Sequence, residues 1–123
     1  MKTITIDNRQ YNLVPIEDIE PLYNDWRLPT VNELIIMFDR ETDEPIIEGF
    51  SSNIYWSSTT YKGNKGSAWG IGFGYGYVGY YSKDYNNYVR CVRDGKNGLQ
   101  WSQSSEEPMD WNKAFEYAKQ LKE

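Results

Sequence analysis

The apolar positions of residues 69–78 alternate strictly with glycines. One face carries Trp69, Ile71, Phe73, Tyr75 and Tyr77, and the other carries Gly70, Gly72, Gly74 and Gly76. An alternation with period two predicts a single β-strand, because successive side chains of a strand point to opposite faces. Such a strand presents an aromatic face for packing and a glycine face that another backbone or a ligand can approach closely.

Shorter runs of alternating or β-branched residues predict further strands. These runs are residues 3–6, 11–14, 54–60, 88–93 and 99–101, with turn sequences at 61–67 and 94–98. The first two runs flank a polar turn and predict an N-terminal hairpin. An acidic connector, residues 15–23, follows the hairpin.

Two segments have the helical period instead. Thr30 and Glu33 have the spacing of a capping box in front of a predicted helix over residues 31–38. Asp110 can cap a second helix that runs to Leu121. Two helices and several short strands predict an α+β domain with an antiparallel sheet.

The loop after this strand pattern has the composition of a binding surface. Residues 79–87 consist almost entirely of Tyr, Asn, Ser and Gly, and tyrosine supplies a large contact area at a small loss of rotamer freedom. An ordinary glycine-rich hairpin with surface tyrosines fits the same composition equally well.

Charge narrows the class of partner. The 123 residues include 13 basic and 18 acidic side chains, a formal charge of −5, which argues against a nucleic-acid ligand. Residues 61–90 differ from the rest of the chain. They contain four basic residues, Lys62, Lys65, Lys83 and Arg90, and one acidic residue, Asp84, which gives this segment a charge of +3. We therefore expect a mildly positive patch and an anionic partner.

The residue types needed for most catalysis are missing. The chain has no histidine, which removes the commonest general base and metal ligand. Residues 74–79 match Gly-x-Gly-x-x-Gly, but a strand-forming segment follows where a dinucleotide site needs a helix. We expect no catalytic residues, no cofactor and no metal, and hence no enzyme.

Two further features have a plain structural interpretation. Cys91, the single cysteine, lies in a β-branched run and is predicted to be a buried thiol. The acidic residues of segment 39–49 could bind calcium, but they lack the spacing of an EF-hand loop, so a solvated acidic loop is the better interpretation.

No run of the chain is apolar enough to enter a membrane, and the first residues lack the apolar core of a secretory signal. We therefore expect no membrane insertion. The chain is expected to be cytoplasmic as synthesised, unless it is carried out on a larger particle such as a virion.

Three blocks together resemble a known family. They are DWRLPTVNEL at residues 25–34, YWSSTT at 55–60, and Ala68–Trp69 leading to YVRCVR at 88–93. Over residues 24–94 the chain is similar to the C-terminal domain of bacterial collagen-like adhesins. That family is similar to the C-type lectin fold, so the resemblance implies a lectin-like domain that binds a ligand without catalysis.

The resemblance also suggests where the ligand binds. Some members bind sulfated polysaccharides, and others, in phages and bacteria, carry a segment diversified by a retroelement. Such diversification commonly produces Asn, Tyr, Asp, Ser and Gly, and the residues between Phe73 and Val89 are almost wholly of these types. By this analogy the ligand-binding face comprises Tyr75, Tyr77, Tyr80, Tyr81, Lys83, Tyr85, Asn86 and Asn87, together with Trp69.

The order of the blocks departs from the family. The strand and helix of residues 98–123 normally precede the DWRLP block, which indicates a circular permutation of a single domain over residues 1–123. A truncated tandem copy would leave the helix without a core. Residues 1–22 match nothing in the family and are interpreted as an added hairpin and linker. The Glu-Pro-Asn signature of calcium-dependent sugar binding is absent.

Two functional hypotheses follow. The first is a lectin-like module that presents its Tyr/Asn/Gly loop to a protein or an anionic glycan, on a phage particle or as an adhesin fragment. The second is an intracellular protein-binding inhibitor or adaptor, such as a phage-encoded protein that blocks a host defence complex.

Overall fold

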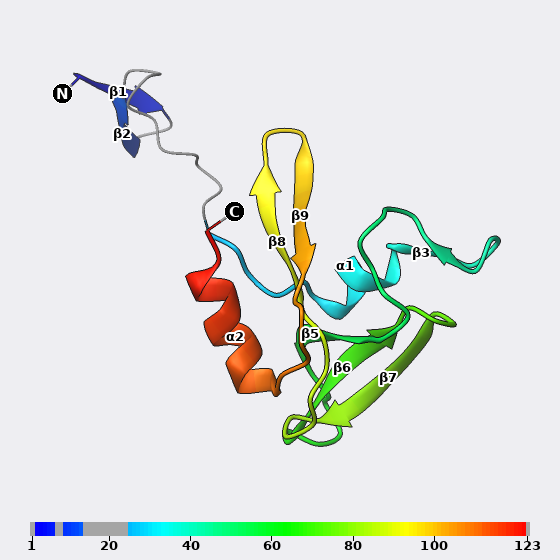
Figure 1. Ribbon diagram of the computed structural model, residues 1–123. Coiled ribbons are helices and arrows are strands. Elements are labelled where there is room, and N and C mark those ends of the chain that lie inside the picture. Colours follow the sequence, from blue (N-terminus) through cyan, green and yellow to red (C-terminus); the bar gives the residue numbers. More distant parts are fainter. Residues whose placement is uncertain (1, 7–8, 14–24, 123) are drawn as a thin grey trace.

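The computed structural model describes residues 2–6, 9–13 and 25–122 (Figure 1). Strand β1 (Lys2–Ile6) pairs with β2 (Arg9–Leu13) in antiparallel register, which confirms the predicted N-terminal hairpin. Val14, at the end of the second predicted run, and the acidic connector 15–23 lie outside the described residues.

The central sheet has three antiparallel strands in the order β5–β6–β7. These strands are β5 (Ile54–Thr60), β6 (Ser67–Gly72) and β7 (Tyr77–Ser82). The structure confirms the predicted strand 54–60 residue for residue. The predicted turn follows it and is closed by a hydrogen bond of 2.8 Å from the N–H of Tyr61 to the carbonyl of Ser67.

The prediction of one strand over residues 69–78 is wrong. Residues 73–76 form a loop, and the chain returns as β7, so that Gly72 pairs with Tyr77. Gly76 has a φ of +70°, a conformation that glycine adopts without the steric cost of a Cβ. The alternating pattern therefore runs through a reversal of the chain. Tyr77 shares a face with Gly72, and not with Trp69 as predicted.

A second hairpin crosses the domain. Strand β8 (Arg90–Gly95) begins and ends two residues later than the strand predicted at 88–93, and β9 (Gly98–Ser104) extends the strand predicted at 99–101. Two isolated bridges join this part of the chain to other elements. Val92 of β8 pairs with Arg27, and Tyr88, which precedes β8, pairs in parallel with Tyr55 of β5. Cys91 is fully buried, as predicted.

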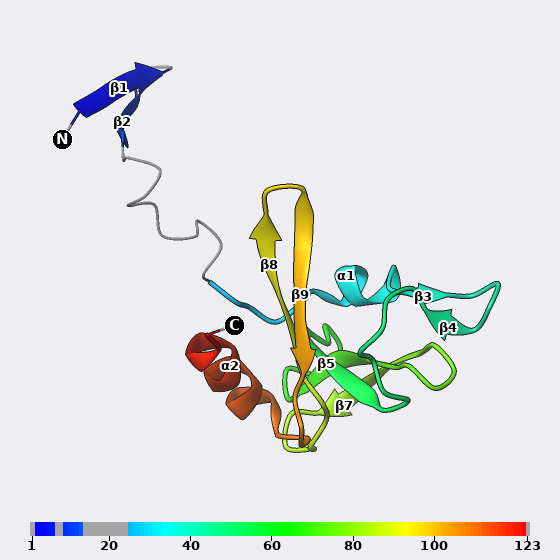
Figure 2. The same cartoon turned by 45° about the horizontal axis from the view of Figure 1, so that its top comes forward.

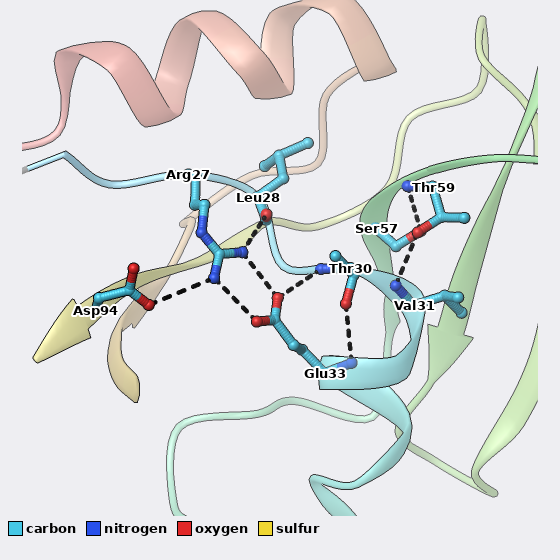
Figure 3. Close-up of polar contacts among 8 residues, drawn as sticks. All are labelled: Arg27, Leu28, Thr30, Val31, Glu33, Ser57, Thr59 and Asp94. Carbon is cyan, nitrogen blue, oxygen red and sulfur yellow. Dashed lines mark hydrogen bonds and ion pairs between the residues drawn. The ribbon is translucent and has the colours of Figure 1, made fainter. Parts of the chain in front are cut away.

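Helix α1 (Val31–Ile35) begins at the predicted capping box (Figure 3). The N–H of Glu33 donates to Oγ1 of Thr30 at 3.2 Å, and the N–H of Thr30 donates to the Glu33 carboxylate at 2.8 Å. The guanidinium of Arg27 donates two further hydrogen bonds to this carboxylate, at 2.8 and 2.9 Å. One carboxylate therefore caps the helix and fixes the segment before it.

Helix α1 is shorter than predicted. It ends at Ile35, where β-branched residues weaken the helical preference. The carbonyl of Met37 then accepts a hydrogen bond of 2.9 Å from the N–H of Ile46. Phe38 consequently lies in β3 (Phe38–Asp39), which pairs with β4 (Glu44–Pro45), and it reaches the core from a strand and not from the helix.

Helix α2 (Trp111–Gln120) has the predicted cap. The N–H of Lys113 donates to the carboxylate of Asp110 at 2.9 Å. Ala114 and Ala118 are buried at the contact with the core, where their small side chains let the helix lie close to the strands. The partly buried residues of this contact include Trp111, Phe115, Tyr117 and Leu121.

Strand β5 separates two hydrophobic clusters, since its neighbouring residues Tyr55 and Trp56 point to opposite faces. The α2 cluster contains Trp26, Leu28, Trp56, Ala68, Val89, Cys91, Ala114 and Ala118. The α1 cluster contains Leu34, Met37, Phe38, Tyr55, Ile71 and Phe73. In both views the two helices lie on opposite sides of the β8–β9 hairpin (Figures 1 and 2).

The loop between β6 and β7 supplies a test of the fold. A Cβ added at Gly76 would lie 2.4 Å from a ring carbon of Phe38 and would sit at a positive φ. We expect Gly76→Ala to lower the free energy of unfolding by about 2–4 kcal/mol, measured by urea denaturation. Gly72→Ala is the matched control, because its nearest contact would be 3.6 Å. Equal losses in the two variants would contradict this account of the loop.

The capping carboxylate makes the stability of α1 depend on pH. Hydrogen bonds from Arg27, opposed in part by burial, hold the pKa of Glu33 below its ordinary value of 4.5. Its stabilising contribution is therefore complete above that value and is lost as the pH falls through the lowered pKa. We expect the stability difference between the wild type and Glu33→Gln to shrink as the pH falls below about 4.5. Glu41→Gln, at an exposed position, should show no such trend.

Candidate ligand-binding site

An open pocket of about 430 Å³ lies on the glycine face of the central sheet. Its walls combine aromatic rings, one aliphatic side chain and bare backbone. The lining residues are Ser52, Ile54, Gly72, Gly74, Tyr75, Tyr77 and Tyr81. Three of the predicted ligand-binding tyrosines therefore meet at one hollow.

Glycines make room for these rings. A Cβ at Gly79 would lie 2.5 Å from a ring carbon of Tyr77 and 3.1 Å from the hydroxyl of Tyr81, so both side chains lie over the bare backbone of β7. A Cβ at Gly70 would meet the carbonyl of Tyr55 at 2.9 Å. Of the four glycines of the predicted face, Gly70 and Gly72 lie on it together with Gly79, and Gly74 and Gly76 lie in the loop. The rings of Tyr77 and Tyr81 that cover this face come from β7 of the same sheet.

Two of the pocket tyrosines are presented to solvent. Tyr75 is 91% exposed in the loop between β6 and β7, and Tyr77 is 65% exposed at the start of β7. Tyr81 is more buried, and its pKa is raised, first by that burial and then by the neighbouring Tyr77. The pocket therefore offers two exposed rings beside a third ring with a phenol that resists ionisation.

The opposite face of the sheet carries a separate aromatic cluster. The ring of Tyr80 stacks on that of Tyr61, with centroids 3.9 Å apart and an angle of 1° between the planes, and both meet Trp69 edge to face. Because Trp69 pairs with Tyr80, both side chains point away from the pocket. The prediction that Trp69 and Tyr80 share one face with Tyr77 is wrong.

The predicted lysine has an intramolecular role. The ammonium of Lys83 donates to Oγ1 of Thr60 at 3.0 Å and lies 3.9 Å from the ring centre of Trp111. These contacts fix the end of β7 against β5 and the start of α2. Lys83 does not line the pocket.

The remaining predicted residues lie in the connection between β7 and β8. Tyr85 and Asn86 are exposed, and neither lines the pocket. Asn87 is buried, and its backbone pairs with Met109, so its side chain cannot belong to an exposed face. The nine predicted residues therefore do not form one surface.

The expected basic patch is smaller than its sequence indicates. Arg90 is buried, and its guanidinium donates to the carbonyl of Ser102 and, at 2.9 Å, to the carbonyl of Glu48. It also lies over the ring of Phe50, 4.5 Å from the centroid. Arg90 therefore supports the fold, and the surface charge comes from Lys62, Lys65 and Lys83.

A second hollow, also about 430 Å³, lies between β9 and α2. Its lining includes Glu106 and Glu107, which would repel an anionic ligand. Within the described ranges, no group of three or more Cys, Asp or Glu side chains could hold a metal ion, and no helix is long and apolar enough to cross a membrane.

Sequence reasoning missed Ser52, Ile54 and Tyr61. Ile54 lies on the glycine face because it pairs with Gly72, and Tyr61 meets Tyr80 because the turn after β5 folds back. A correct register for the β5–β6 hairpin would have placed Ile54 on the face of the pocket and Tyr61 beside Tyr80. Ser52 precedes β5 in a bend, and no pattern in the sequence marks it.

A small α+β domain with an open pocket of rings and glycines has the features of a ligand-binding module. The profile of the family described as the Lcl C-terminal domain matches residues 17–93, and the chain belongs to this family. The predicted membership of the C-terminal domain family of collagen-like adhesins is thereby confirmed, and the domain is of the type associated with adhesin binding. No curated protein and no solved structure matches the chain.

The phenol of Tyr81 gives the pocket a measurable signature. We expect its NMR titration to fall above its ordinary pKa of 10.0, and Tyr77→Phe to lower the pKa of Tyr81 only in part, because burial remains. Since the folded pKa is raised, the stability linked to Tyr81 is complete below pH 10 and is lost at higher pH. A Tyr81 pKa that returned fully to its ordinary value in Tyr77→Phe would contradict the dominance of burial.

Proposed function

We propose that this domain is a non-catalytic binding module whose tyrosine pocket holds a sugar ring of an anionic glycan. The observation that carries the proposal is the pocket itself, in which Tyr75, Tyr77 and Tyr81 surround a floor of glycine backbone. Flat rings with a polar hydroxyl can stack on one face of a sugar and hydrogen-bond its edge.

Basic side chains at the far end of the central sheet support a long anionic glycan, one that extends from the pocket along the sheet, over a short or neutral one. No carboxylate lines the pocket. Lys62 and Lys65 are exposed in the turn between β5 and β6, at the end of the sheet opposite to the β6–β7 loop that lines the pocket, whereas the acidic β3–β4 hairpin lies beside that loop. The two lysines would attract sulfate or carboxylate groups of a longer glycan, with an attraction that weakens as salt is added.

The chemistry of the pocket supports binding without reaction. Its only titratable side chains are the three tyrosines. A tyrosine that acted as a nucleophile or a general base near neutral pH would need a pKa lowered to about 7. The pKa of Tyr81 is raised instead, so this phenol, like an ordinary tyrosine, is protonated at neutral pH and can donate a hydrogen bond.

The proposal includes a circularly permuted lectin-like domain. Ala118 and the partly buried Leu121, near the end of α2, pack in the same cluster as Trp26 of the DWRLP block. That packing agrees with a helix that occupies the position it would have if it preceded this block. Termini that lie close together are the usual condition for a permutation.

Binding to a sulfated polysaccharide and to its desulfated form tests the proposed function. We expect Tyr75→Ala and Tyr77→Ala each to weaken binding roughly two- to tenfold, because each removes one stacking ring. Their melting temperatures should stay near that of the wild type, since both side chains are largely exposed.

Tyr85→Ala is the matched control, because Tyr85 is 61% exposed but does not line the pocket. Binding that is lost in Tyr85→Ala and retained in Tyr75→Ala and Tyr77→Ala would place the site on the loop between β7 and β8. Equal affinity for the sulfated and desulfated forms at low salt would contradict the anionic ligand.

A further inference from the structure

The outer edge of β7 has no partner strand. β7 is the last strand in the order β5–β6–β7, and no isolated bridge within the described ranges involves it. The other edge of the sheet is covered, because Trp56 and Ser58 of β5 donate backbone hydrogen bonds of 2.9 and 2.8 Å to the carbonyls of Tyr88 and Pro29. Both views show β7 at the outside of the domain (Figures 1 and 2).

Two hydrogen bonds define which backbone groups face outward. The N–H of Lys83 donates to Gly66 at 2.8 Å, and the N–H of Phe73 donates to Asn53, on the β5 side, at 3.0 Å. Backbone direction alternates along a strand. The residues of β7 whose backbone groups point to β6 are therefore Tyr77, Gly79 and Tyr81, and those whose groups point outward are Val78, Tyr80 and Ser82. The carbonyl of Ser82 already accepts a hydrogen bond of 2.9 Å from the N–H of Tyr85, so the free outward groups are those of Val78 and Tyr80 and the N–H of Ser82.

This edge lacks the features that usually prevent strands from pairing. β7 has the sequence YVGYYS, with no charge and no proline, and it contains three tyrosines, which favour strands. Natural sheets normally protect an open edge with lysine, proline, a bulge or a covering element. Tyr80 is also 53% exposed on the aromatic cluster beside this edge.

The two ends of the edge carry opposite charge. At the start of β7, the guanidinium of Arg40 donates to the carbonyl of Gly76 at 2.9 Å, which places the β3–β4 hairpin there. That hairpin carries four acidic residues, Asp39, Glu41, Asp43 and Glu44, against the one basic residue Arg40. At the other end lie Lys83 and the turn that contains Lys62 and Lys65, joined through the hydrogen bond between Lys83 and Gly66, against the one exposed acidic residue Asp84.

We infer that β7 pairs in antiparallel register with β7 of a second copy of this chain, about a two-fold axis at Tyr80. Val78 then pairs with Ser82 of the second copy, and the two sheets become one sheet of six strands. The acidic end of each β7 lies beside the basic end of the other. This complementarity favours a second copy over an unrelated strand, even though each chain carries a net charge of −5.

The symmetry has a consequence for ligand binding. A two-fold axis perpendicular to the sheet leaves both tyrosine pockets on the same face, where one long ligand could occupy both. The pairing itself does not depend on the proposed function, because it uses the edge of β7 and not the pocket. Failure of either inference therefore leaves the other intact.

Sedimentation equilibrium of the full chain over a range of concentrations tests the pairing. We expect a reversible dimer for the wild type. Tyr80→Pro removes the outward N–H of Tyr80 from both copies and should weaken the dimer at least roughly tenfold, since about one net hydrogen bond is lost from each. Tyr80→Thr is the control, because it removes the ring but keeps the N–H, so it should weaken the dimer less.

Charge reversal provides a second, independent set of variants. Lys62→Glu with Lys65→Glu should weaken the dimer, as should Glu41→Lys with Glu44→Lys. All four changes together should restore it, because the opposite ends again carry opposite charge. This series decides the question if Tyr80→Pro does not fold.

Amide exchange by NMR locates the contact. The N–H groups of Val78, Tyr80 and Ser82 should gain protection as the concentration rises, while those of Tyr77, Gly79 and Tyr81 should change little. A wild type that stays monomeric at every concentration overturns the inference. So does a dimer whose affinity is unchanged by a folded Tyr80→Pro and by the charge reversals.

Discussion

The domain depends on the alternation of two neighbouring side chains in β5. Tyr55 and Trp56 are both fully buried, yet they enter different clusters because adjacent residues of a strand point to opposite faces. Each polar atom is satisfied at a distant element. The hydroxyl of Tyr55 donates to Ser104 at 2.8 Å, and the indole N–H of Trp56 donates to the carbonyl of Met109 at 2.8 Å. A one-residue slip of β5 would exchange the two clusters and leave both groups buried without these partners.

Buried Arg90 connects β8 to the segment before β5. Its guanidinium is held by backbone carbonyls of Glu48 and Ser102 and lies over the ring of Phe50. Gly49 makes this approach possible, since a Cβ there would lie 3.0 Å from the guanidinium. A positive charge that looks like part of a binding patch in the sequence is thus used to fix a long loop against the core.

The two faces and the open edge of the central sheet form three different surfaces. The glycine face holds the tyrosine pocket, and the other face packs on α1 and carries the Tyr61, Trp69 and Tyr80 cluster. The outer edge of β7 has no partner strand in the described part of the chain, although the carbonyl of Ser82 at its end accepts a hydrogen bond from the N–H of Tyr85. All three surfaces come from the same hairpin, so a change in its register would disturb each of them.

The sequence by itself determined the local elements whose signals involve neighbouring residues. The capping box of Thr30 and Glu33, the cap at Asp110, the strand 54–60, the buried Cys91 and the family of the domain were all predictable. Only the tertiary structure decided where the chain reverses. The alternation continues in the sequence through the four-residue loop 73–76, although odd-numbered residues of β6 and β7 lie on opposite faces of the hairpin, so the period alone could not separate Trp69 from Tyr77. It also could not show that Arg90 and Asn87 are buried, because their burial depends on contacts with Glu48 and Met109, which are distant in the sequence.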